Sequence, residues 1–359
     1  MRRRPTAVIG AFVAGVLVAG CGSAPGPAPV VPPDNGGPAP STSTAAPAPP
    51  AEPARAGEPT STPAGQVVPL GNAPEGIVVG QSGTAAVAVR GPDAIVLVDA
   101  ATGAERSRVP VPSAARHLSL TGPDGPVLVA LEGTDELLEL SLADGQVLSR
   151  VGGVGRQPHE ATTTADGTIV VTSEGGGGVI FVRDGHVVAT LPAGPPQPGG
   201  VAAVGDYVAV ADVRGNGVWV YDAVSRREVA HAPVGVKLTH AVALSGELAA
   251  FADTDGGAVL IERIDPRISE VARIEAPGKP YGLAYDPGRR RLYITLTESN
   301  RLRVVDVTDP RQSRLLGDVP TVRQPNSVAV VGDTGTVLVT GSRADGGGSL
   351  QILPVGLLP

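Results

Sequence analysis

The sequence predicts an all-β protein whose folded part is a seven-bladed β-propeller, and three observations lead to this prediction. A short apolar motif, often introduced by Pro or Gly, returns seven times at intervals of 40 to 45 residues, a period typical of propeller blades. β-branched segments of four to six residues, bounded by Gly, Asp, Asn or Pro, fill these intervals. They lack the 3.6-residue period of helical repeats. The seven motifs are centred on Gly76, His117, Glu160, Gly200, His240, Gly282 and Ser327.

Residues 1–21 predict a secretion signal that ends in a lipid attachment site. Three arginines precede an uncharged, mostly apolar run of 14 residues, which is too short to span a bilayer as a helix. The run ends in Leu-Val-Ala-Gly-Cys, which resembles the lipobox of bacterial lipoproteins. The resemblance implies that Cys21, the only cysteine, becomes the lipidated N-terminus and anchors the protein to the extracytoplasmic face of the cell membrane. An ordinary secretion signal with a chance cysteine is the alternative.

Residues 22–66 predict a disordered linker between the membrane and the folded domain. The segment contains 13 prolines among Ala, Ser, Thr and Gly, and it contains no aromatic residue from which a core is built. Because proline fixes φ and removes a backbone donor, we expect a semi-extended spacer. A cell-wall-binding or glycosylated stalk is the alternative interpretation.

The net negative charge of the chain limits the kinds of molecule that it is expected to bind. The formal charge is -7, and it falls to about -10 if the three arginines of the signal are removed. A chain this acidic lacks the positive charge that phosphate backbones require, so we expect no nucleic acid partner. Like charge also opposes self-association, so we expect a monomer and rank a purely structural role in a surface array last.

Residues 67–359 are predicted to form the propeller, with four antiparallel strands in each unit. The sixth unit, for example, contains candidate strands at 281–285, 291–296, 301–306 and 312–317. The seventh unit ends one strand short, and we expect QVVPL at residues 66–70 to supply its outer strand and close the ring. Six blades with irregular ends are the alternative.

The sixth unit, RRRLYITLTESNRLRVVDVTDP, resembles the YVTN repeat of surface-layer-type and YncE-like propellers. AIVLVDAATGAE and GVWVYDAVSRRE match the second half of that repeat. The resemblance implies an extracytoplasmic seven-bladed ring, commonly used as a binding platform and sometimes converted to an enzyme. The aspartates that end the third strands (Asp99, Asp222 and Asp306) are predicted to bond the following turn.

Histidines gather at one predicted position of the fold. Three of the five, His117, His159 and His240, begin an innermost strand, and Glu160 follows His159. Because innermost strands surround the central channel, these residues are candidate ligands for Zn or another divalent metal, and a neutral imidazole is also a general base. The alternative is that they only hydrogen-bond loops or water. Adjacent side chains alternate along a strand, so His159 and Glu160 are not both expected to point inward.

The neighbouring positions predict a polar channel mouth of mixed charge. Glu75, Arg116, Tyr281 and Asn326 occupy the corresponding columns of four units and are candidate binding residues. Catalytic motifs such as G-x-S-x-G and H-E-x-x-H are absent, so we expect a non-enzymatic scaffold that binds an envelope protein or peptide. The alternative function is a metal-assisted lyase or hydrolase with its site in the channel.

Overall fold

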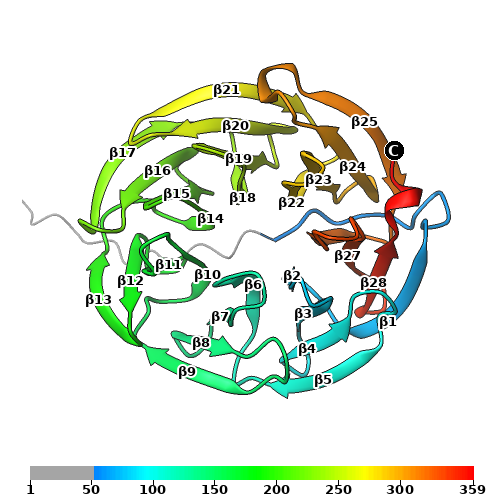
Figure 1. The fold of residues 1–359 in the computed structure, drawn as a ribbon, viewed down its shortest axis with the longest axis horizontal. Coiled ribbons are helices and arrows are strands. Elements are labelled where there is room, and N and C mark those ends of the chain that lie inside the picture. Colours follow the sequence, from blue (N-terminus) through cyan, green and yellow to red (C-terminus); the bar gives the residue numbers. More distant parts are fainter. Residues whose placement is uncertain (1–51) are drawn as a thin grey trace, which may run out of the picture. The chain divides into compact units, whose positions relative to one another are not determined.

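A computed structural model describes residues 52–359, and this part of the chain is almost entirely antiparallel β-sheet. Its strands form seven four-stranded sheets, which surround a central axis as the blades of a propeller (Figure 1). The predicted fold class is therefore confirmed. The predicted lipidation site Cys21 and residues 1–51 lie outside the described residues.

The first four blades follow one another along the chain, and each runs outward from the axis. Blade one contains β2 (Ile77–Val79), β3 (Thr84–Val89), β4 (Ala94–Asp99) and β5 (Glu105–Pro110). Blade two contains β6 (Ala115–Leu120), β7 (Val127–Leu131), β8 (Glu136–Leu140) and β9 (Val147–Gly152). Blade three contains β10 (Pro158–Thr163), β11 (Ile169–Ser173), β12 (Val179–Arg183) and β13 (His186–Leu191). Blade four contains β14 (Pro198–Val204), β15 (Tyr207–Asp212), β16 (Gly217–Asp222) and β17 (Arg227–Pro233).

The last three blades continue this order. Blade five contains β18 (Leu238–Ala243), β19 (Leu248–Asp253), β20 (Ala258–Ile264) and β21 (Ile268–Glu275). Blade six contains β22 (Pro280–Asp286), β23 (Arg291–Leu296), β24 (Arg301–Asp306) and β25 (Arg314–Pro320). Blade seven contains β26 (Pro325–Val330), β27 (Val337–Ser342), β28 (Gly347–Leu353) and, from the other end of the chain, β1 (Gln66–Asn72).

The ring closes through β1, as the sequence predicts. β1 is the outermost strand of blade seven and pairs antiparallel with β28, so that Val68 lies opposite Leu350. The pairing covers an edge of β28 that would otherwise expose unpaired backbone groups. Figure 1 shows this strand of the N-terminal region beside the C-terminal strands at the rim.

The outer strand of blade six differs from the prediction. The sequence analysis expects a strand over 312–317, whereas β25 spans Arg314–Pro320. A short 3-10 helix, η1 (Pro310–Gln312), precedes it, because Asp309 accepts a hydrogen bond from the backbone of Arg311 and so bends the chain. A second 3-10 helix, η2 (Val355–Leu357), follows the last strand.

Burial follows the position of each strand in its blade. All six residues of β3 are buried, because the middle strands pack against neighbouring blades on both faces. The outer strand β5 alternates between exposed and half-buried residues. The core therefore lies between blades, as where Val87 and Val96 of blade one pack with Leu338 and Leu350 of blade seven.

Turns confirm the predicted role of the repeated aspartates. Asp99 Oδ1 accepts hydrogen bonds from the backbone N–H groups of Ala101 and Thr102 at 3.0 and 2.9 Å. Asp222 and Asp306 bond the chain two residues ahead in the same way, at 2.9 Å each. These carboxylates hold the turns into the outer strands, at the end of the ring away from the histidines.

The structure differs from the linker prediction over residues 52–65. This segment contains no helix or strand, but it runs in an extended path from the axis to the rim (Figure 1). Specific contacts with the ring fix it: Asn300 Nδ2 donates to the Gly57 carbonyl at 3.0 Å, and the Ala64 N–H donates to the Pro320 carbonyl at 3.1 Å. No helix within residues 52–359 is long and apolar enough to cross a membrane.

Candidate functional site

One end of the central channel is closed by polar and aromatic side chains, and we call this end the channel mouth. It is formed where each chain segment enters its innermost strand. His117, His159, His240 and Tyr281 occupy this position in blades two, three, five and six, and each is at most 7% exposed. The repeat that the sequence displays therefore concentrates its buried polar residues on the propeller axis.

The three candidate histidines meet although they are far apart in the sequence. The ring centroid of His117 lies 4.6 Å from that of His159 and 4.2 Å from that of His240. His240 Nε2 is within hydrogen-bond distance of His117 Nδ1, at 3.2 Å. Tyr281 extends this cluster of rings, because its ring centroid is 4.2 Å from that of His240 in an edge-to-face contact.

Burial keeps two of these imidazoles neutral. Burial, and to a smaller extent the neighbouring His159, lower the pKa of His240 to about 3. The pKa of His117 is also well below its ordinary value, because of burial and then because of His240 and His159. His117 Nε2 and His240 Nδ1 have no hydrogen-bond partner among the described residues. The ring cluster therefore presents unprotonated or unpaired ring nitrogens at a buried site.

His159 differs because it faces a carboxylate. Its Nδ1 lies 3.1 Å from Oε2 of Glu174, the residue that follows β11. Burial opposes a charged ring, but the Glu174 carboxylate outweighs burial and raises the pKa of His159. The other oxygen of Glu174 accepts a hydrogen bond from Gln197 Nε2 at 3.0 Å. This pair is the most enclosed ionisable contact at the mouth, with both side chains at most 2% exposed.

Arg116 joins several carboxylates at the same end. Its Nη1 bonds Glu75 Oε1 at 2.9 Å, its Nε bonds Glu132 Oε1 at 2.6 Å and its Nη2 bonds Glu52 Oε1 at 2.5 Å. Burial opposes the guanidinium charge, but the carboxylates outweigh it and raise the pKa of Arg116. Burial raises the pKa of Glu75, which also pairs with Arg90. Two of the predicted mouth residues, Glu75 and Arg116, are thus direct partners.

The other two predicted mouth residues hold neighbouring elements. Burial raises the pKa of Tyr281, whose ring packs edge-on against His240. Asn326 Nδ2 donates to the Pro74 carbonyl at 3.3 Å, which links blade seven to the start of blade one. Both residues are buried, so their contacts fix the mouth rather than offer an exposed surface.

Glu160 does not join the histidines. Its Oε2 accepts a hydrogen bond from the backbone N–H of Val201 in blade four, at 3.0 Å. The residue lines a separate cavity of about 530 Å³, which the inner strands form farther along the channel. Burial raises the pKa of Glu160 to about 8. The prediction of Glu160 as a metal ligand is therefore wrong: side chains alternate along β10, so Glu160 points away from His159, and the bond to Val201 holds it there.

Three charged residues of the mouth were missed by the sequence analysis. Arg90, Glu132 and Glu174 each follow the second strand of their blade directly and are spaced 42 residues apart. Antiparallel pairing places the end of the second strand beside the start of the innermost strand. The residue after the second strand therefore reaches the same mouth, and its 42-residue period is the signal that identifies it.

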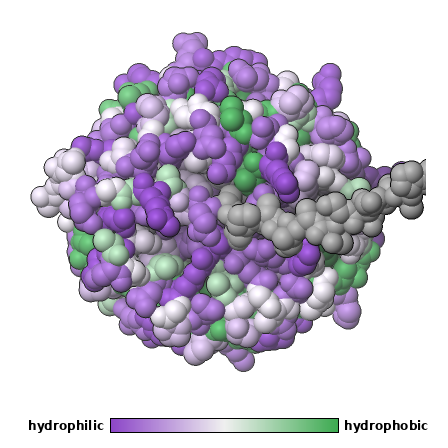
Figure 2. All heavy atoms as spheres, turned by 180° about the vertical axis from the view of Figure 1, so that it is seen from behind, coloured by the Kyte–Doolittle hydropathy of each residue, from purple (hydrophilic) through white to green (hydrophobic). Residues whose placement is uncertain are grey.

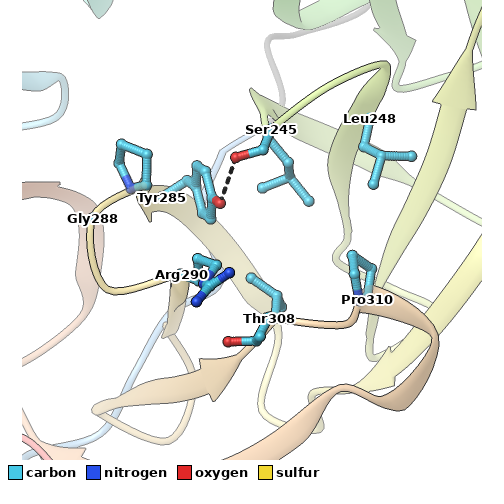
Figure 3. Close-up of a pocket in the computed structure, with 10 residues that line it drawn as sticks. Ser245, Leu248, Tyr285, Gly288, Arg290, Thr308 and Pro310 are labelled. Carbon is cyan, nitrogen blue, oxygen red and sulfur yellow. Dashed lines mark hydrogen bonds between the residues drawn. The ribbon is translucent and has the colours of Figure 1, made fainter.

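A second pocket lies away from the axis, between blades five and six (Figure 3). It has a volume of about 500 Å³, and Ser245 Oγ and Tyr285 OH are hydrogen-bonded across it at 2.8 Å. Arg290 is its only charged lining residue among the described residues. This pocket therefore lacks the paired acid and base groups that are found at the channel mouth.

No protein-family model matches the sequence, and no curated protein matches it. Solved structures do match. A chain of hydrazine synthase from Kuenenia stuttgartiensis is 18% identical with a TM-score of 0.69, covering 81% of this chain and 98% of that one. Virginiamycin B lyase from Staphylococcus aureus is 14% identical with a TM-score of 0.65, covering 81% and 99%. The WD40 repeats of RRP9 are 16% identical with a TM-score of 0.68, covering 83% and 99%. At this identity the likeness shows the fold alone.

Proposed function

We propose that this chain is a lipid-anchored, extracytoplasmic scaffold protein whose propeller binds an extended, acidic segment of an envelope protein or peptide. The observation that carries the proposal is the path of residues 52–65. The ring already holds a polypeptide segment across its mouth, and that segment belongs to the chain itself.

The contacts of this segment define the chemistry that the mouth recognises. Ring side chains supply the donors: Arg116 binds the Glu52 carboxylate, Asn300 binds a backbone carbonyl, and Arg323 lies 3.5 Å from the Glu58 carboxylate. The segment supplies carboxylates and carbonyl oxygens. A partner with the same acceptors, in an extended proline-containing chain, fits this surface.

The hydrophilic character of the outer surface supports a partner that is bound through polar groups. The face of the ring in Figure 2 is mainly hydrophilic, with apolar side chains scattered over it. Apolar patches of several hundred Å² mark the docking sites of apolar partners. A surface of this kind favours a partner held by charge and hydrogen bonds.

Photo-crosslinking in the intact envelope tests the scaffold. A crosslinking residue at Ser113, which lines the mouth, is compared with one at Val224, which lies beyond Asp222 at the opposite end of the ring. We expect Ser113 alone to capture an envelope protein through an acidic segment that mass spectrometry identifies. No captured protein, or the same proteins from both positions, would contradict the proposal.

Membrane attachment rests on the lipobox resemblance at Cys21 and has its own test. We expect the wild-type chain to incorporate a labelled fatty acid and to sediment with membranes. Cys21→Ser should remove the label and release the protein, because one thiol carries the attachment. A labelled or membrane-bound Cys21→Ser protein would contradict the anchor.

A metal-assisted lyase or hydrolase is the second candidate function. It is favoured by the convergence of His117, His159 and His240 beside carboxylates in a closed channel. Virginiamycin B is an available probe, because a lyase for it shares the fold. This candidate expects metal-dependent turnover that His159→Gln abolishes; unchanged antibiotic after incubation with metal-loaded protein would contradict activity on that substrate.

A further inference from the structure

We propose that Glu132, His159 and Glu174 bind one divalent transition-metal ion, Zn²⁺ or Mn²⁺, at the channel mouth. One ligand atom from each of these residues lies within 4.8 Å of the others. Of the four ligands predicted from the sequence, this set keeps only His159, and two carboxylates from loops replace His117, Glu160 and His240. The inference goes beyond the scaffold function and does not depend on it.

The fold delivers these three side chains from adjacent blades. Glu132 follows β7 of blade two and Glu174 follows β11 of blade three, at equivalent positions of the repeat. His159 is the second residue of β10, which pairs with β11. One donor therefore lies in a strand and the other two lie directly after the ends of strands, where the sheet positions them.

The donor set indicates the class of metal. One imidazole nitrogen and two carboxylate oxygens suit Zn²⁺ and Mn²⁺, whereas Ca²⁺ prefers oxygen ligands alone. Zinc bonds of about 2.1 Å place tetrahedral ligand atoms about 3.4 Å apart. The present 4.8 Å limit thus needs only a small side-chain rotation to close around an ion.

Neighbouring groups already orient the ligands. Arg116 Nε holds Oε1 of Glu132 at 2.6 Å, and Gln197 Nε2 holds Oε1 of Glu174 at 3.0 Å. Each carboxylate is fixed through one oxygen, as outer partners commonly fix metal ligands. Oε2 of Glu174 faces His159 Nδ1 at 3.1 Å.

A buried polar atom points independently to a ligand. His159 is 2% exposed, and its Nδ1 makes no hydrogen bond of normal geometry with any described residue, although Glu174 Oε2 is near. His117 Nε2 is also unpaired, and its ring lies 4.6 Å from that of His159. Buried nitrogens of this kind are normally hydrogen-bonded, so a missing ligand explains them.

The local charges favour a cation. Glu52, Glu75, Glu132 and Glu174 supply four carboxylates, and only Arg90 and Arg116 pair with them as guanidinium groups. With His159 neutral, as a metal ligand must be, two negative charges remain, and a divalent ion balances them. Burying unbalanced carboxylates without such an ion is unfavourable.

The ion has a route from solvent. The Glu132 side chain is 15% exposed and lines a pocket of about 450 Å³ between blades two and three. An ion that enters this pocket meets Glu132 first and then the enclosed pair of His159 and Glu174.

Calorimetric titration of the metal-stripped full chain with Zn²⁺, Mn²⁺ and Ca²⁺ tests the site. We expect one Zn²⁺ or Mn²⁺ ion per chain and weak or absent Ca²⁺ binding. His159→Gln and Glu174→Gln should each weaken binding by about tenfold or more. The matched control is His231→Gln, which removes an exposed histidine that lies 2.8 Å from Glu228 and should leave binding unchanged.

A second measurement guards against variants that do not fold. Circular dichroism identifies folded variants, and Glu132→Asp, a milder change at the more exposed ligand, should bind Zn²⁺ more weakly than wild type but more tightly than Glu132→Gln. The absorption spectrum of bound Co²⁺ should change in each folded ligand variant. No stoichiometric binding by the wild type, or binding that survives His159→Gln and Glu174→Gln but is lost in His240→Gln, would overturn the proposal.

Discussion

Arg116 is the central positive charge of the channel mouth. Its one buried guanidinium forms ion pairs with carboxylates from three segments of the chain. The sequence identified Arg116 and Glu75 as neighbours in two columns of the repeat. Their direct pairing could not be predicted, because it depends on the path of Arg116 between blades. The same limit applies to Glu160, which was predicted beside the histidines but bonds the Val201 backbone of blade four.

Replacing this residue should destabilise the ring. Arg116→Gln leaves Glu75 and Glu132 without their buried partner, so we expect the free energy of unfolding to fall by about 3 kcal/mol. Urea denaturation followed by circular dichroism measures the change. Arg150→Gln is the control, because its ion pair with Glu136 is exposed and should contribute less than about 1 kcal/mol. Equal stability of the two variants would contradict this account.

Glu262 of β20, far from the channel mouth, should make the stability of the protein depend on pH. It is 2% exposed and lies opposite Glu270 of β21, while Arg273 lines the same groove and binds Glu275. Burial, and to a smaller extent the charge of Glu270, raise the pKa of Glu262 from 4.5 to about 7. The folded chain thus holds a proton that the unfolded chain releases between these values, so stability falls as pH rises through this window.

Thermal unfolding at pH 5 and pH 8 measures this effect. Glu262→Gln cannot ionise, so its free energy of unfolding should not fall with the wild type's. Between pH 5 and pH 8 we expect the variant to become about 1 kcal/mol more stable relative to the wild type. The exposed Glu298→Gln should show the wild-type pH dependence. An equal pH dependence of wild type and Glu262→Gln would show that the buried carboxyl does not retain its proton.

Among the elements, β1 is the strand whose long-range pairing was predicted: it joins the N-terminal segment to the last blade. The seventh unit lacked a fourth strand, and QVVPL was the apolar segment left to supply it. The segment just before it was predicted less well. Residues 52–65 lack the apolar groups of a core, but polar contacts with Arg116, Asn300 and Gln351 fix them, and those partners lie far away in the sequence.

The closing strand should stabilise the ring through its one buried side chain. Leu70 is 5% exposed and packs in the core shared by blades seven and one. We expect Leu70→Ala to lower the free energy of unfolding by about 2 to 4 kcal/mol, because it leaves a cavity at the closure. Val67→Ala, at a position 42% exposed on the same strand, is the control in the same urea denaturation. Similar losses for the two variants would contradict the closure by β1.

For the whole molecule, the repeat predicted the fold and not the function. A period near 42 residues and short β-branched strands determine seven blades, because each blade buries its faces only against its neighbours. The proposed function depends on a few side chains at the axis. Glu132 and Glu174 follow the second strands of adjacent blades, and only the packing of blade two against blade three brings both of them to His159.

The proposed scaffold function requires the channel mouth to bind an extended acidic segment, and binding of a synthetic peptide measures this. The probe is a fluorescent peptide that copies residues 52–65, and its anisotropy is measured with the wild-type chain and with Glu52→Lys/Glu58→Lys. The double variant should release its own segment and bind the peptide saturably, about tenfold or more tightly than the wild type, whose tethered segment competes. A peptide with Gln at both glutamate positions should bind weakly. Equal binding of both peptides, or no difference between the two chains, would contradict the claim.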